Sequence, residues 1–61
     1  MADKVLLKKS IDSLEYNNTL ILKRLRNVTD KNKIEELNRT IAKNNSMILD
    51  YKFQLEMNKL E

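Results

Sequence analysis

Two rows of apolar residues run along this chain at alternating intervals of three and four, the spacing of side chains that share one face of a packed α-helix. The first row consists of Leu7, Ile11, Leu14, Asn18, Ile21, Leu25 and Val28, and the second of Ile34, Leu37, Ile41, Asn44, Ile48, Tyr51 and Leu55. The second row starts two positions out of phase with the first. A heptad repeat absorbs insertions of three or four residues, and neither supplies that shift. One continuous rod would instead place Asn32, Glu35 and Arg39 on the row, so the phase argues against this alternative.

Reversal of the chain near Lys31 would bring the two rows face to face, with Val28 opposite Ile34 and Leu7 opposite Leu55. No glycine or proline interrupts either row. The sequence therefore predicts an all-α fold, a coiled-coil-like antiparallel helical hairpin that forms a single domain over 1–61. The expected elements are a helix at about 4–27, a turn at about 28–33 and a helix at about 33–59.

Polar residues stand where these helices need caps. Asp3 suits the N-cap of the first helix. Either Asp30 or Asn32 could cap the second, and Asn32 with Glu35 has the spacing of a capping box.

A chain of 61 residues needs more than its own core, since cores of this size rarely supply more than about 3–5 kcal/mol. The chain has no Cys for a disulfide and no His for a zinc site. We therefore expect a homo-oligomeric helix bundle, most simply a dimeric four-helix bundle. Apolar residues outside the two rows mark the expected oligomer interface, namely Val5, Leu6, Leu49, Phe53, Met57 and Leu60. A groove for the helix of another protein is the alternative for these residues.

Asn18 and Asn44 occupy opposing positions of the two rows. A buried Asn in such a row lowers stability but selects one alignment of the helices. We expect these two residues to form a register-setting polar layer. The alternative is a polar pocket that accepts a ligand between the helices.

Positive charge gathers around the expected turn. Between Lys23 and Lys43 lie seven basic and three acidic residues, a net charge of +4, which leaves −1 for the rest of a chain whose total is +3. All the arginines fall in this segment, and Arg binds phosphate through two parallel hydrogen bonds. The candidate anion-binding residues are Lys23, Arg24, Arg26, Arg39 and Lys43. The alternative is a solvated face with helical ion pairs such as Glu35–Arg39.

Composition argues against catalysis. Without His and Cys the chain lacks the commonest general base and the best nucleophile. It also lacks a glycine-rich phosphate loop. We therefore expect no enzyme activity, no catalytic residues, no metal and no cofactor. No apolar run approaches the about 20 residues that span a bilayer, and we expect no signal peptide because the first residues lack an apolar h-region. The expected location is the cytoplasm, and abundant Lys, Asn, Ile and Leu suggest a low-GC bacterium or its phage, in which case it is the host cytoplasm.

The function favoured by these features is that of a small regulatory or inhibitory binding protein. It would act through protein–protein contacts, with itself and with another protein as partners. The first alternative is a protein that binds or sequesters phosphate-bearing ligands, either RNA or a small nucleotide signal, through the basic turn. The second is a structural coiled-coil adaptor.

Overall fold

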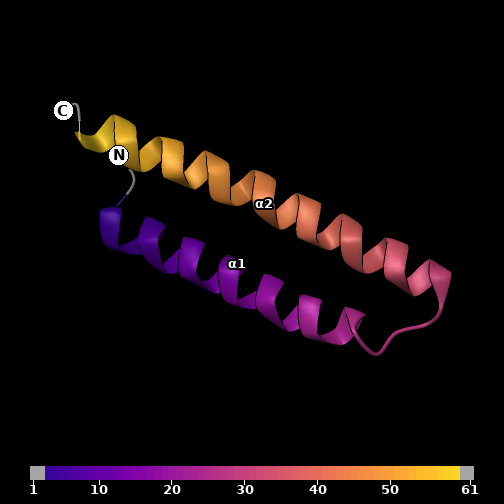
Figure 1. Cartoon of the computed structure of the whole chain (residues 1–61). Coiled ribbons are helices and arrows are strands. Elements are labelled where there is room, and N and C mark those ends of the chain that lie inside the picture. The colour runs from indigo at the N-terminus through magenta and orange to yellow at the C-terminus, as the bar shows by residue number, and fades with distance from the viewer. Residues whose placement is uncertain (1–2, 60–61) are drawn as a thin grey trace.

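The computed structural model describes residues 3–59, which form two α-helices packed against each other. Helix α1 covers Lys4–Leu25 and helix α2 covers Lys31–Lys59. Figure 1 shows the two helices side by side, joined by residues 26–30 at one end, with the start of α1 and the end of α2 at the other. We call these the loop end and the open end. The prediction of an all-α fold is confirmed for the described residues.

Aspartates begin both helices. The Asp3 side chain accepts a hydrogen bond from the Val5 amide at 2.9 Å. The Asp30 side chain accepts one from the Asn32 amide at 3.0 Å, and the Asp30 carbonyl accepts one from the Ile34 amide at 3.0 Å. Each aspartate thus satisfies an amide that has no partner in the first turn of a helix.

The turn lies slightly earlier than the sequence predicts. Helix α1 ends at Leu25 instead of about residue 27, because the Asn27 amide donates to the Arg24 carbonyl three residues back and tightens the last turn. Helix α2 begins at Lys31 instead of about residue 33. Of the two predicted caps, Asp30 is the one used. The capping-box prediction for Asn32 was wrong, because Asn32 lies inside the first turn of α2.

The core lies along the two predicted rows, which we call the seam. Every one of the fourteen seam residues is buried or half-buried. Within residues 3–59 the fully buried ones are Leu7, Ile11 and Ile48, at 5–7% exposure. All three lie in the half of the hairpin near the open end, whereas the seam residues near the loop are half-buried. The core is therefore thin, and it is densest away from the loop.

The described residues form a narrow body whose principal extents are 48 × 14 × 12 Å. Neither α1 nor α2 contains a stretch both long and apolar enough to cross a lipid bilayer. Two flat sides of the hairpin flank the seam, and the candidate functional residues lie on them.

Candidate functional site

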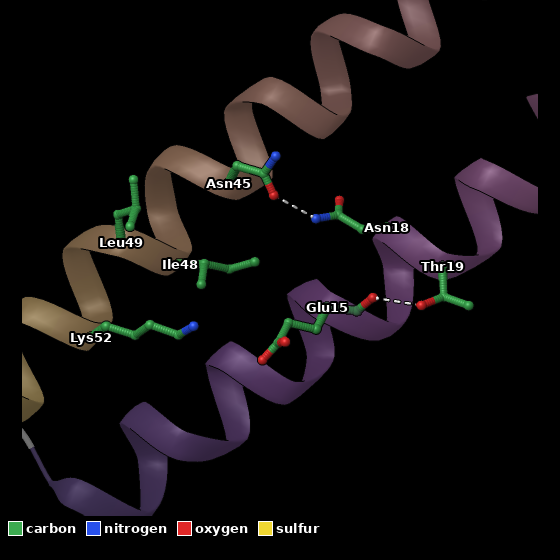
Figure 2. Close-up of a pocket in the computed structure, with 7 residues that line it drawn as sticks. All are labelled: Glu15, Asn18, Thr19, Asn45, Ile48, Leu49 and Lys52. Carbon is green, nitrogen blue, oxygen red and sulfur yellow. Dashed lines mark hydrogen bonds between the residues drawn. The ribbon is translucent and has the colours of Figure 1, made fainter.

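Three asparagine side chains join the helices halfway along the seam. The Asn44 Nδ2 donates to the Asn18 Oδ1 at 2.9 Å, and the Asn18 Nδ2 donates to the Asn45 Oδ1 at 2.9 Å. Figure 2 shows Asn18 of α1 and Asn45 of α2 pointing toward each other. The structure thus brings the predicted pair Asn18 and Asn44 together. Sequence reasoning missed Asn45, although its place beside Asn44 in the sequence was a usable signal.

The hydrogen bonds of this layer join the two helices in one alignment. Asn18 uses both its donor and its acceptor across the interface, and a slide of one helix by one turn would separate it from both partners. A slide along an all-aliphatic seam would instead exchange one apolar contact for another. We therefore expect the polar layer to select the alignment of the helices more than to add stability.

Replacing this layer by leucines tests that role. The double variant Asn18→Leu with Asn44→Leu is expected to raise the free energy of unfolding by about 1–2 kcal/mol, because apolar area replaces half-buried amides. Urea unfolding measures this change, and spin-label distances between the helices should broaden as other alignments become populated. A large loss of stability with unchanged distances would contradict the role.

One flat side of the hairpin, which we call the charged face, carries two solvent-open hollows. The first, of about 470 Å³, is shown in Figure 2 and is lined by Glu15, Asn18, Thr19, Asn45, Ile48, Leu49 and Lys52. In that view Ile48 points from α2 toward α1, while Leu49 lies on the outer side. The second is lined by Lys4, Lys8, Lys52, Leu55, Glu56 and Lys59. Six of the twelve residues that line these hollows are charged.

The other flat side, which we call the low-charge face, also carries two hollows. One is lined by Leu6, Lys9, Ser10, Ser13, Leu14, Met47 and Tyr51, and the other by Asn17, Leu20, Ile21, Arg24, Thr40 and Asn44. Only two of these thirteen residues are charged and none is acidic. Asn17 and Thr19 lie about 100° to either side of Asn18 on α1, so the two faces are on opposite sides of the seam.

The predicted interface residues are strongly exposed, but they do not gather in one hollow. Val5, Leu6, Leu49, Phe53 and Met57 expose 47–69% of their surface. Leu6 lines the low-charge face and Leu49 the charged face. Leu60 lies outside the described residues. Four further exposed hydrophobic residues lie outside the predicted interface set, namely Tyr16, Leu20, Leu22 and Met47. Their positions outside the seam were the available signal.

The predicted anion-binding residues are all exposed, and they lie between the loop and the middle of the hairpin, where Lys43 precedes Asn44. Arg24 lines a hollow on the low-charge face, and Arg26 is the C-cap of α1. Arg39 and Lys43 line a neighbouring hollow with Asn32, Glu36 and Thr40, and Thr40 also lines the hollow that contains Arg24. The structure therefore distributes these cations over this half of the hairpin instead of converging them on one point.

Ion pairs between the described residues do not neutralise the positive charges near the loop. Among residues 3–59 the ion pair is Lys59–Glu56, at 3.2 Å near the open end. The alternative pair Glu35–Arg39 is not formed within this range, and both side chains are exposed. The charges between Lys23 and Lys43 thus face water and any approaching molecule.

Within the described range, no group of three or more acidic, His or Cys side chains is placed to hold a metal ion. No family model, curated protein or solved structure matches this chain. The candidate function consequently rests on the geometry of the hairpin.

Proposed function

We propose that this chain is a non-enzymatic binding protein that works as a homo-oligomeric helix bundle and regulates or inhibits another macromolecule by direct contact. The observation that carries the proposal is the distribution of apolar surface. Three hydrophobic side chains are buried within residues 3–59, whereas nine large ones are exposed by 36–69%. Scattered apolar residues are normal on a protein surface, but this ratio in so small a body supports a covering partner.

The small size of the core also favours self-association. A core with three buried aliphatic residues lies at the lower end of what sustains an isolated domain. Pairing two hairpins would move part of this exposed apolar surface out of water, at roughly 25 cal/mol per Å² of apolar area. Folding and self-association would then be thermodynamically coupled.

Concentration dependence tests this proposal. If folding and association are coupled, a tenfold dilution is expected to lower the Tm by about 5 °C, because about 1.4 kcal/mol is lost per assembled dimer. Circular dichroism melts across a concentration series measure the shift, and sedimentation equilibrium gives the mass. A monomer mass together with a Tm independent of concentration would overturn the proposal.

A second candidate function is the binding of a phosphate-bearing ligand at the loop end. The specific observation in its favour is the set of cations between Lys23 and Lys43 that make no ion pair with the described residues. Arginines present planar donors that match phosphate oxygens. RNA or a small nucleotide would be the ligand class.

Replacing Arg24, Arg26 and Arg39 together by alanine tests the second candidate. Binding of a fluorescent single-stranded RNA is expected to fall at least tenfold, while the helical content and the mass stay unchanged. Wild-type binding should also weaken steeply with added salt, since contacts to phosphates release counterions. As a matched control, Lys4, Lys8 and Lys9 at the open end are replaced by alanine, which removes the same charge. Equal losses in the two triple variants would contradict a site at the loop end.

A further inference from the structure

We propose that the low-charge face receives a second copy of this chain, with the loop ends of the two hairpins at opposite ends of the pair. This inference rests on the proposed self-association and adds to it the face, the orientation and the contacts.

The choice of face follows from desolvation. Burying an unpaired charge is costly, and half of the residues that line the charged face are ionised side chains. On the low-charge face, the α1 residues Leu6, Ser10, Ser13, Asn17 and Leu20 are uncharged, and the two charged residues that line its hollows, Lys9 and Arg24, lie beside this row and at its loop end. The uncharged positions are three or four apart and therefore form one stripe along the helix. Small serines between two leucines let another helix approach closely.

The orientation follows from the distribution of charge. The segment from Lys23 to Lys43, with its net +4, occupies the loop end of a body 48 Å long. Two copies with loops at the same end would bring these segments together within a Debye length of about 8–10 Å. Copies with loops at opposite ends separate the two loops by about the length of the hairpin, and only the Lys43 ends of the two segments come near each other. Like-charge repulsion thus favours opposite ends.

Symmetry then determines which helices meet. When two identical faces pack with their loops at opposite ends, the two-fold axis lies parallel to the face and across the helices. Each α2 therefore packs antiparallel on the α2 of the second copy, and each α1 on the other α1. An arrangement with loops at the same end would instead place α1 on the α2 of the second copy.

The α2 stripe beside this face carries complementary charges in that arrangement. Lys43, Met47 and Asp50 are four and three residues apart and share one side of α2. With Met47 next to the two-fold axis, Lys43 of each copy lies opposite Asp50 of the other. The axis repeats this contact, so two ion pairs flank a central contact between methionines. Met47 is 36% exposed and available for it.

The α1 stripe fits the same axis. An axis near residue 15 places Ser13 of one copy beside Asn17 of the other, and Ser10 beside Leu20, so that small residues meet larger ones. Leu14 and Met47 line one hollow, so this part of α1 lies at the level of Met47. A single axis therefore serves both helices. The face is 48 Å long and 14 Å across, which is of the order of the about 800 Å² that each partner buries in a standard interface.

The test of the face compares two substitutions on opposite sides of α2. Met47→Glu is expected to weaken dimerisation on the order of a hundredfold, because it places two carboxylates beside the axis. Leu49→Glu adds the same charge to the charged face and should leave the dissociation constant within about twofold. Sedimentation equilibrium measures both variants, and circular dichroism at high concentration confirms that each remains helical.

The test of the orientation mixes two charge variants. Lys43→Asp alone and Asp50→Lys alone each create like-charge contacts and should weaken dimerisation about tenfold, because the axis repeats each contact. Mixed together, they should form a heterodimer with nearly wild-type affinity, which native mass spectrometry resolves. A spin label at Lys31 should report a distance between copies of the order of the 48 Å length of the hairpin.

The outcomes separate this inference from the proposed function. A wild-type monomer would overturn both. A wild-type oligomer that Leu49→Glu or Phe53→Asp dissociates, while Met47→Glu does not, would keep self-association and overturn the choice of face. Labels at Lys31 close together, or no heterodimer preference, would overturn the orientation. If the wild type is monomeric and binds another protein, and Met47→Glu abolishes that binding, the low-charge face would be assigned to that protein.

Discussion

Replacing Ile48 by alanine is expected to lower the free energy of unfolding by about 2–4 kcal/mol, which is most of the stability of a chain of this size. Ile48 is the buried residue of α2 and extends toward α1 between the two helices. Its truncation removes apolar contacts and leaves a cavity that two straight helices cannot close by bending. The variant should be largely unfolded at micromolar concentration.

The neighbouring residue supplies a matched control. Leu49→Ala removes a similar volume from a side chain that is 69% exposed, and it should change the free energy of unfolding by no more than about 0.5 kcal/mol. Urea titrations followed by circular dichroism compare the two variants. Equal effects would mean that the seam does not hold the helices together.

Inserting one alanine between Ala42 and Lys43 is the second large change, and it is expected to prevent stable folding. One extra residue rotates the rest of α2 by about 100°. Ile48, Tyr51 and Leu55 would then point to one side of the seam, and Asn44 and Asn45 would lose Asn18. Alanine itself favours the helical conformation, so the loss of stability would come only from the rotation of the later seam residues relative to the earlier ones.

The same alanine inserted between Val28 and Thr29 is the control. Lengthening a five-residue connection by one residue costs well under 1 kcal/mol in loop closure, and both halves of the seam keep their phase. The loop variant should melt within a few degrees of the wild type, and the helix variant should show no cooperative transition. Cooperative melting of the helix variant at the wild-type temperature would contradict a seam based on phase.

Part of the candidate surface could be read from the chain. Residues such as Leu49 and Phe53 fall outside the seam in the sequence, and the structure exposes them. Their division between two faces could not be read in this way, because it depends on which side of the seam each position occupies once the hairpin has closed. Leu20 was missed as a surface residue for that reason. The absence of an ion pair between Arg39 and Glu35 could not be predicted either, because a spacing of four residues permits this pair but does not enforce it.

By itself, the sequence determined that this protein consists of two helices, where the chain turns, and which fourteen residues lie between the helices. It could do so because helix phase is a local and periodic property, and two rows out of phase by two residues cannot belong to one helix. Only the tertiary structure decided that Asn45 joins the polar layer and that few charged residues line the hollows of one face. These features depend on how two helix surfaces meet, which single positions along a chain do not specify.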